Sequence, residues 1–457
     1  MNSSVHSFQA SLEYTQSYFA KRFGKGLFTL AEPTAPRIRL DDCGKSVVLP
    51  PFLGGLGVDS LLEGGLELRM LPADAFVKET LGEVNIPALC QRGTPSPSRL
   101  VTVEEDTVLL HFDLLGSAFY ILTRTEEFLS PVRDTHDRFP ATASHALAHG
   151  YLHRPVVDEY VEILRRCIQH LWPGVERKQD SFRTMVTHDV DVPFEYLFRP
   201  GWKAARIFGG DILRRHSPHL AFNRAARWFD VKHLGGWQRD PLYTFETNMD
   251  ISESHGLKSA FYFLIGRNSP MDGEYNLTHP RIAALMRRIH DRGHEIGYHG
   301  SYTTYRDADT TRLEVSVLKE AASTLGIEQT TWGGRQHYLR WNAPVTWRNY
   351  AEAGLHYDTT LSYADHAGFR CGTCHPFPVF DVEHNTALNL VEHPLIVMEC
   401  SVLDDRYMNL PHGEAQEYIL KLKRTCRKFG GCFGLLWHNS RFVEPAEVEL
   451  YKSALEG

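Results

Sequence analysis

The segment MVTHDVD (Met185–Asp191) determines how we interpret the rest of the chain. Its apolar residues predict a buried strand that ends in two carboxylates, one residue apart, with a histidine beside them. Two neighbouring acids at a strand end repel each other and lose solvation, and a fold retains them readily where a cation or a reaction requires the pair. The alternative is an ordinary solvated strand end with acidic turn residues. For this segment alone, we favour that alternative.

The composition of the chain narrows its class. At 457 residues, it is long enough for two or three domains with sizeable cores. Its net charge of −7 gives no reason to expect a nucleic-acid partner. No apolar run approaches the roughly 20 residues of a membrane span, and the N-terminus does not resemble a signal peptide. Eight cysteines are too few for a disulfide scaffold. We therefore expect a cytoplasmic protein with reduced cysteines and no membrane span.

The first part of the chain, residues 1 to about 180, predicts a separate α+β domain. Ser46–Leu49 and Val108–Phe112 are strand-like and lie between turn-rich stretches, and Asp113–Leu122 fits a buried helix. Val156–Trp172 has apolar residues at helical spacing and ends before Pro173-Gly174, so we expect a helix that connects two domains. No cluster in this part indicates chemistry. Its expected role is packing or contact.

From about residue 181 to the end, apolar strands alternate with amphipathic helices. The helix expected after His299 places four apolar residues on its inward face, Leu313, Val317, Ala321 and Leu325. The main predicted strands are 183–188, Ser259–Ile265, His294–His299, a segment ending at Arg335, and Cys432–Trp437. Such alternation indicates βαβ units and a parallel sheet, open or closed into a barrel. In both cases, the active site lies at the C-terminal ends of the strands.

Polar residues gather at these strand ends. The predicted strands deliver Asp189 with Asp191, then His299, then Arg335 with His337, and finally His438. Carboxylate, imidazole and guanidinium groups at four strand ends are typical of a metal-dependent hydrolase. A mixed Asp/His set favours zinc or another late divalent metal. Glu399 and Asp404 follow a further strand-like segment, and either is a candidate for an acid that supports the site.

In this order, the motifs resemble those of the NodB-type polysaccharide deacetylases, carbohydrate esterases that act on acetylated sugars. The resemblance covers about Arg183 to Asn439. Thr187–Asp191 resembles the first motif in its D-x-D form, and Ser259–Gly266 resembles a strand that often reads ATFFL. Gly293–His299 closely matches GHEIGxH, and Gly334–Tyr338 stands in place of R-P-P-Y. Tyr357–Leu361 is similar to Y-D-S-S, and Leu435–His438 resembles the closing motif. The first half, toward Arg154–Asp158, resembles an uncharacterised module that accompanies some of these deacetylases.

The resemblance implies an α/β fold, a distorted (β/α) barrel of the NodB type, which hydrolyses an acetamide or acetyl ester. It implies that Asp191 and His299 hold a divalent metal, expected to be zinc, which polarises the carbonyl and lowers the pKa of its water. Asp189 is then the general base, and His438 protonates the leaving amine or alkoxide. Arg335 orients Asp189 and keeps it ionised.

The second metal-binding motif departs from the family pattern. The family usually has H-[ST]-x-x-H, whereas this chain reads His299-Gly300-Ser301-Tyr302-Thr303, with threonine in place of the second histidine. Catalytic zinc usually has three protein ligands. His337 is our candidate for the third ligand, because a proline commonly holds that place in the related motif. The alternatives are that His337 lines the substrate pocket, or that the site has lost its metal and only binds sugar.

Substrate contact is predicted for five residues, namely His188, Tyr338, Asp358, Arg370 and Trp437. His188 is equally well explained as a packed, hydrogen-bonded histidine. Arg370 suits an anionic substrate, with a surface ion pair as the alternative that we favour.

An insert at about residues 196–240 lies between the first two predicted strands of the second domain. Its segment Arg199–Lys232 is rich in arginine and aromatic residues. We favour a helical cap that packs on the barrel. The alternative is a lid that contacts sugar rings through its aromatic residues and a phosphate or uronate through its arginines.

The leading hypothesis is therefore a metal-dependent deacetylase of an acetylated carbohydrate, such as a nucleotide-linked or lipid-linked precursor of a surface polysaccharide. A sugar-binding or scaffold protein of a polysaccharide pathway, built on a degenerate deacetylase barrel, is the alternative from another class. A related hydrolase of a cyclic amide or ureide is the third hypothesis.

Overall fold

The computed structural model describes residues 2–23, 30–31, 36–40, 44–175 and 180–456. The chain forms two units. One contains residues 1–183, 339–396 and 422–433, and the other contains residues 184–338, 397–421 and 434–457. The sequence-based boundary at about residue 180 remains a prediction, as does a separate N-terminal domain.

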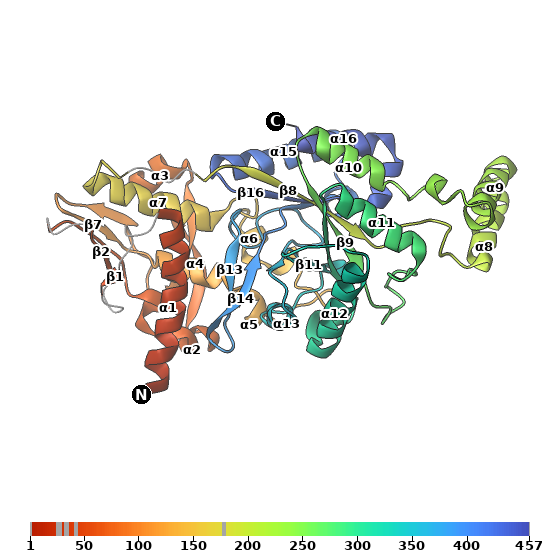
Figure 1. Cartoon of the computed structure of the whole chain (residues 1–457). Coiled ribbons are helices and arrows are strands. Elements are labelled where there is room, and N and C mark those ends of the chain that lie inside the picture. Colours follow the sequence, from red (N-terminus) through yellow and green to blue (C-terminus); the bar gives the residue numbers. More distant parts are fainter. Residues whose placement is uncertain (1, 24–29, 32–35, 41–43, 176–179, 457) are drawn as a thin grey trace. The chain divides into compact units, whose positions relative to one another are not determined.

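A curled sheet of parallel strands forms the centre of the unit that contains Asp189 and Asp191 (Figure 1). The strands follow the order β11-β10-β9-β8-β16-β15, and the pairs β8–β9, β9–β10, β10–β11 and β15–β16 are parallel. Their bounds are β8 (Arg183–Val190), β9 (Ser259–Leu264), β10 (Glu295–Gly300), β11 (Gly333–Gln336), β15 (Val397–Met398) and β16 (Cys432–Leu436). The expected alternation of strands and helices in an α/β fold is confirmed.

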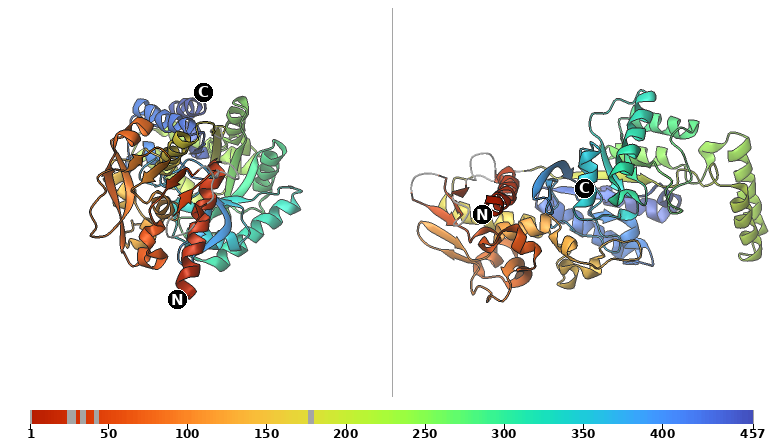
Figure 2. Two further views of the ribbon diagram at one scale, coloured as in Figure 1. Left: turned by 90° about the vertical axis from the view of Figure 1, so that its left-hand side faces the viewer. Right: turned by 90° about the horizontal axis from the view of Figure 1, so that it is seen from below.

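Helices connect these strands. They are α8 (Gly201–Leu213), α9 (Pro218–His233), α10 (Phe245–Ser254), α11 (Pro280–Asp291), α12 (Ala308–Thr324), α14 (Glu399–Leu403), the first part of α15 (His412–Lys428) and α16 (Pro445–Leu455). Short 3-10 turns are η3 (Trp237–Arg239), η4 (Thr304–Arg306), η5 (His337–Leu339) and η6 (Asn439–Val443). The antiparallel pair α8–α9 stands away from the sheet of its own unit (Figures 1 and 2). The insert is therefore helical, as expected.

The buried face of α12 differs from our prediction. Leu313 is 63% exposed and Val317 is 39% exposed, while Val315 and Leu318 are buried. The sequence offers two apolar stripes at helical spacing, and only tertiary contacts select between them. The observed choice buries Glu314, whose carboxylate accepts hydrogen bonds from the Tyr298 and Ser301 hydroxyls.

The other unit combines a five-stranded sheet, a hairpin and helices. The sheet has the order β1-β2-β3-β7-β6, β4 pairs with β5, and β12 and β13 flank β14. The strands are β1 (Leu30–Ala31), β2 (Arg37–Ile38), β3 (Ser46–Val48), β4 (Leu66–Pro72), β5 (Asn85–Gln91), β6 (Val101–Val103), β7 (Thr107–Leu110), β12 (Tyr357–Asp358), β13 (Phe377–Asp381) and β14 (Thr386–Glu392). The helices are α1 (Asn2–Phe23), α2 (Gly57–Leu62), α3 (Ala75–Leu81), α4 (Leu114–Leu122), α5 (Thr125–Leu129), α6 (His145–Ala148), α7 (Val156–Leu171) and α13 (Val345–Glu352), with 3-10 turns η1 (Phe52–Gly55) and η2 (Ala141–Ala143).

A buried charge cluster links distant segments of this unit. The Glu127 carboxylate pairs with the Arg370 guanidinium (Nε–Oε1, 2.9 Å) and with that of Arg124 (Nε–Oε1, 2.9 Å). All three side chains are at most 4% exposed. Burial raises the pKa of Glu127, but the two guanidinium groups outweigh burial and lower it below its ordinary value of 4.5. The ion pair of Arg370 is therefore buried, and our preference for a surface pair was wrong.

We predict that Glu127→Gln lowers the free energy of unfolding by about 3–5 kcal/mol, because two guanidinium groups then remain buried without their carboxylate. Denaturant unfolding measures this change. Glu79→Gln is the matched control, because Glu79 forms an exposed pair with Arg166 and is expected to contribute about 1 kcal/mol or less.

The contribution of Glu127 depends on pH. Since its folded-state pKa lies below the unfolded value, the stabilisation is present above the ordinary value of 4.5 and is lost as the pH falls further. The difference in stability between the wild type and Glu127→Gln should therefore shrink in acid. A difference that grows as the pH falls would contradict this assignment.

Candidate functional site

The parallel strand ends bring the predicted polar residues of one unit together. Asp189 and Asp191 are two positions apart, so their side chains point to the same side of the chain. In the sheet register, His299 of β10 lies beside Arg335 of β11, and Asp189 of β8 lies beside Tyr262 of β9. Strands of one parallel sheet end on the same edge, which is why residues up to 250 positions apart in sequence meet there.

Asp191, His299 and His337 form a group with the spacing of metal ligands. The Asp191 Oδ1 atom lies 3.1 Å from His299 Nε2 and 3.6 Å from His337 Nε2. Three ligands in a tetrahedral zinc shell are about 3.4 Å apart when the metal–ligand bonds are about 2.1 Å. The three atoms lie within 4.8 Å of one another, and such a group could hold a metal ion. His337 is thus close enough to Asp191 and His299 to complete a group of three possible ligands.

The other ring nitrogen of each histidine is held by an acceptor. The Nδ1 atom of His299 lies 2.9 Å from the Arg335 carbonyl oxygen, and that of His337 lies 3.2 Å from Asp272 Oδ1. An acceptor on Nδ1 places the proton there and leaves the Nε2 lone pair free to coordinate a metal. The Asp272 carboxylate is itself fixed, because it accepts hydrogen bonds from the backbone N–H groups of Ser269 and Tyr302.

Two buried atoms in this group indicate that a cation fits. Within the described residues, neither Asp191 Oδ1 nor His299 Nε2 has a hydrogen-bond partner. When the only His299 proton is on Nδ1, both atoms are acceptors, and positive charge between them, from a cation or from a second proton on Nε2, is needed to satisfy both. A buried unsatisfied polar atom costs about 1–3 kcal/mol, and a divalent cation between the two atoms would satisfy both. The residues present therefore fit a metal ion.

Asp189 is held differently from Asp191. The Arg335 Nη1 atom donates a hydrogen bond of 2.7 Å to Asp189 Oδ1, and Arg335 Nη2 donates one of 2.9 Å to Thr187 Oγ1. Arg335 is fully buried and Asp189 is 3% exposed, whereas the Asp191 side chain is 29% exposed. The second oxygen, Asp189 Oδ2, faces the imidazoles of His299 at 3.7 Å and His438 at 4.0 Å. This oxygen is available to accept a proton.

His438 lies at the end of β16, opposite the two carboxylates. Its Nε2 atom is 3.6 Å from Asp191 Oδ2, and its Nδ1 atom donates a hydrogen bond to Glu399 Oε1. Burial lowers the pKa of His438, but the Glu399 carboxylate outweighs burial and raises it well above its ordinary value of 6.5. His438 therefore carries a proton that it can donate from Nε2.

The charges of the site also shift the pKa values of the other groups. Burial raises the pKa of Asp191, but the His337 and His299 imidazoles outweigh burial and lower it far below its ordinary value. Burial lowers the pKa of His299, and the Asp189 and Asp191 carboxylates raise it above its ordinary value. Both shifts indicate that this cluster of carboxylates stabilises positive charge.

Three predicted substrate-binding residues belong to the same unit. His188 and Trp437 are fully buried. The Nδ1 atom of His188 lies 2.6 Å from the Trp437 carbonyl oxygen, and its ring stacks on Phe261. Burial lowers the pKa of His188 to about 4, so this histidine is neutral. Tyr338 is half-buried and packs edge-on against His337. Of these three, Tyr338 has the most exposed side chain, and its contact with a substrate remains a prediction.

The other two predicted substrate-binding residues belong to the second unit. The Asp358 carboxylate is buried and accepts hydrogen bonds from the backbone and hydroxyl groups of Thr360. The Arg370 guanidinium is held by Glu127 and the Ser362 carbonyl oxygen. Both side chains are committed to internal contacts, and their roles in substrate binding remain predictions.

Sequence reasoning missed Asp272 and named Glu399 only as one of two candidates. Asp272 lies in a long loop after β9, where no motif marks it. Thr303, the residue in place of the family's second histidine, is exposed. Asp272, in the loop after β9, instead contacts His337, which directly follows β11.

Comparison with known proteins gives limited matches. Residues 60–173 match the model of a family of unknown function (DUF7033). No curated protein matches the chain. Among solved structures, the chain is similar to a polysaccharide deacetylase described from Mycobacterium smegmatis, with 19% identity over 61% of this chain and 83% of that chain and a TM-score of 0.38.

Two further solved structures are similar. The first is Puue allantoinase, with 13% identity over 62% of this chain and 84% of that chain and a TM-score of 0.36. The second is described as a probable polysaccharide deacetylase from Pseudomonas aeruginosa PAO1, with 14% identity over 48% of this chain and 66% of that chain and a TM-score of 0.34. Because these identities and TM-scores are low, the chemistry has to be inferred from the site itself.

In the described part of the chain, no helix has the length and apolar character needed to cross a bilayer.

We predict that the wild type retains a divalent metal after dialysis and that His337→Ala lowers the metal content, because a site with two protein ligands holds zinc poorly. Asp272→Asn should weaken metal affinity about 10–100-fold, since it removes the acceptor that orients His337. Elemental analysis and a competing chelator measure both effects. His412→Ala removes an exposed imidazole of the same unit and serves as the control. Unchanged metal content in His337→Ala would exclude His337 as a ligand.

Proposed function

We propose that this protein is a metal-dependent hydrolase that removes the acetyl group from an acetylated sugar or polysaccharide precursor. The observation that carries the proposal is that the two carboxylates have different partners. Asp191 faces two imidazole nitrogens at ligand spacing, while Asp189 is held by Arg335 with one oxygen left free. This arrangement supplies a metal site and a separate base.

Asp191, His299 and His337 would hold the metal, which when bound supplies a Lewis acid for the carbonyl oxygen and acidifies water. Asp189 accepts the proton of the attacking water at Oδ2. Arg335 fixes the rotamer of Asp189, since the pair is buried and hydrogen-bonded. His438 donates a proton from Nε2 to the leaving amine or alkoxide, and Glu399 maintains its positive charge.

A cavity beside Asp191 supports a sugar substrate. It has a volume of about 210 Å³ and is lined by Asp191, Asp272 and the aromatic side chains of Phe194, Phe198 and Tyr275, among others. Aromatic walls with a few convergent polar groups are typical of small-molecule sites. The cavity therefore gives an acetylated sugar access to the partly exposed Asp191.

We predict that Asp189→Asn lowers kcat for release of acetate from an N-acetylated amino sugar by about 10²–10⁴-fold, the usual contribution of a general base. The asparagine is nearly isosteric but cannot accept the proton. Asp250→Asn changes an exposed carboxylate of the same unit and should leave kcat unchanged. Retained turnover in Asp189→Asn would contradict the role of Asp189. A wild-type protein that binds no metal and releases no acetate from amide or ester substrates would refute the proposed function.

A second prediction separates the acid from the base. His438→Ala should lose hydrolysis of the acetamide by about 10²–10⁴-fold but retain cleavage of p-nitrophenyl acetate, whose leaving group needs no proton. Asp189→Asn should lose both reactions, because both need an activated water. Equal losses of both reactions in His438→Ala would exclude His438 as the general acid.

A further inference from the structure

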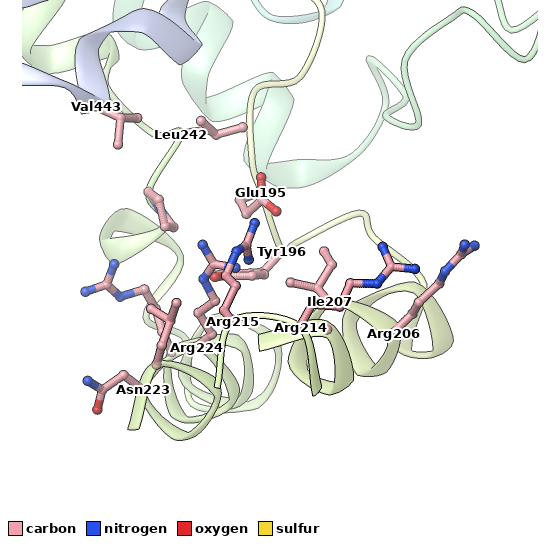
Figure 3. Close-up of a pocket in the computed structure, with 14 residues that line it drawn as sticks. Glu195, Tyr196, Arg206, Ile207, Arg214, Arg215, Asn223, Arg224, Leu242 and Val443 are labelled. Carbon is pink, nitrogen blue, oxygen red and sulfur yellow. The ribbon is translucent and has the colours of Figure 1, made fainter. Parts of the chain in front are cut away.

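The α8–α9 hairpin borders a second, larger cavity of about 810 Å³ (Figure 3). Its lining includes five arginines, Arg206, Arg214, Arg215, Arg224 and Arg227, together with Asn223. Glu195, Tyr196, Leu242 and Val443, which lie outside the two helices in the sequence, also line it. Figure 3 shows Arg215 extending from the helices toward Glu195 and Tyr196, and Arg206 extending away from them. The cavity thus has cationic groups together with apolar side chains such as Ile207 and Leu220 in its walls.

The positive charge of this hairpin contrasts with the rest of the chain. Residues 199–234 contain eight lysines and arginines and two aspartates, whereas the whole chain has a net charge of −7. Like charges around one cavity repel each other unless an anion compensates them. A scaffold of internal ion pairs is the structural alternative, and it predicts that each arginine has a carboxylate partner.

Internal pairing accounts for only two of the five arginines. Asp211 is fully buried and pairs with Arg215 and with Arg224, whose Nη1 atom lies 3.1 Å from Asp211 Oδ1. Asp211 therefore positions these two guanidinium groups at the pocket.

Glu195 is the acidic residue among those that line the pocket. Glu195 pairs with Arg199 at 3.1 Å, and Arg199 does not line this cavity. Arg206, Arg214 and Arg227 make no ion pair with any described residue. Three guanidinium groups thus remain available for an external anion.

The arginine pocket adjoins the cavity of the metal group. Glu195 lines both cavities, and the smaller one is also lined by Asp191, Arg199 and Lys203. Four residues of extended chain span at most about 14 Å, which limits the separation of the Asp191 and Glu195 backbones. Asn439, the residue after His438, donates hydrogen bonds to the carbonyl oxygens of Val192 and Leu242, and so ties both strand-end loops together.

We propose that the arginine pocket binds the diphosphate of a carrier-linked sugar whose acetylated ring occupies the metal site. The inference rests on the proposed function and names its substrate class. Guanidinium groups bind phosphate oxygens in pairs, and five of them around one cavity suit two adjacent phosphates better than a single carboxylate. A nucleoside diphosphate and a lipid diphosphate share this chemistry.

Binding of inorganic pyrophosphate to the full chain, measured by calorimetry, tests the pocket. The triple variant Arg206→Gln/Arg214→Gln/Arg227→Gln should raise Kd about tenfold or more, because each lost charge-assisted hydrogen bond weakens binding. The triple variant Arg37→Gln/Arg39→Gln/Arg99→Gln removes three exposed arginines elsewhere, has the same net charge and should bind as the wild type does. Circular dichroism verifies that both variants fold. Absence of saturable binding, or equal weakening in both variants, would overturn the proposal.

Two further experiments distinguish the possible binding sites of pyrophosphate and the possible carriers of the sugar. Asp191→Asn should bind pyrophosphate as the wild type does, and loss of binding would place the anion at the metal site and overturn the proposal. Competition by uridine diphosphate or by farnesyl diphosphate supports the pocket, and the tighter competitor identifies the carrier. Glucuronate that competes as well as pyrophosphate would overturn the diphosphate class.

The outcomes also distinguish this inference from the proposed function. A protein that hydrolyses neutral acetylated sugars but fails to bind pyrophosphate would contradict this inference alone. A protein that binds pyrophosphate without turnover would contradict only the proposed function.

Discussion

The close approach of Asp191 and His299 is the constraint on which the site depends. Their facing atoms are 3.1 Å apart, and His299 Nδ1 is hydrogen-bonded to the Arg335 carbonyl oxygen, so Nε2 is the nitrogen directed at Asp191. A carboxylate oxygen and an imidazole nitrogen this close in a buried position need positive charge between them, which either a proton or a metal cation supplies. The neighbouring groups follow from this requirement. His337 supplies a third lone pair, and Asp272 orients it.

The two aspartates Asp189 and Asp191 differ in their partners. Asp189 is buried and pairs with Arg335, a fully buried arginine that donates a hydrogen bond to one of its two oxygens. Asp191 is partly exposed and lies among three imidazoles. On the other side of the site, Glu399 gives His438 the positive charge that a proton donor needs. Each chemical group therefore has a partner that sets its charge, which is the usual organisation of acid–base catalysis.

The insert adds a second chemical property to the unit. Its helices carry arginines on the side of a large cavity, and a buried aspartate organises two of them. We favoured a packed cap from the sequence. The structure instead has a helical pair that stands away from the sheet of its unit, with a cationic pocket that shares Glu195 with the cavity at Asp191 (Figures 1 and 3). Under the proposed function, this pocket would make the length of the substrate, and not the reacting group alone, a determinant of specificity.

By itself, the sequence determined the alternation of strands and helices and the residues at the strand ends, because apolar periodicity and motif order are local properties of the chain. It also named Asp189, Asp191, His299, His337 and His438, which the structure brings together. Tertiary structure alone decided which apolar stripe of α12 is buried, that Arg370 pairs with Glu127, and that Asp272 and Glu399 hold His337 and His438. Those outcomes depend on contacts between segments far apart in sequence, and no local pattern encodes the partner of a buried charge. The segment Met185–Asp191 thus contains both carboxylates, and the tertiary structure gives them different partners, Arg335 for Asp189 and the imidazoles of His299 and His337 for Asp191.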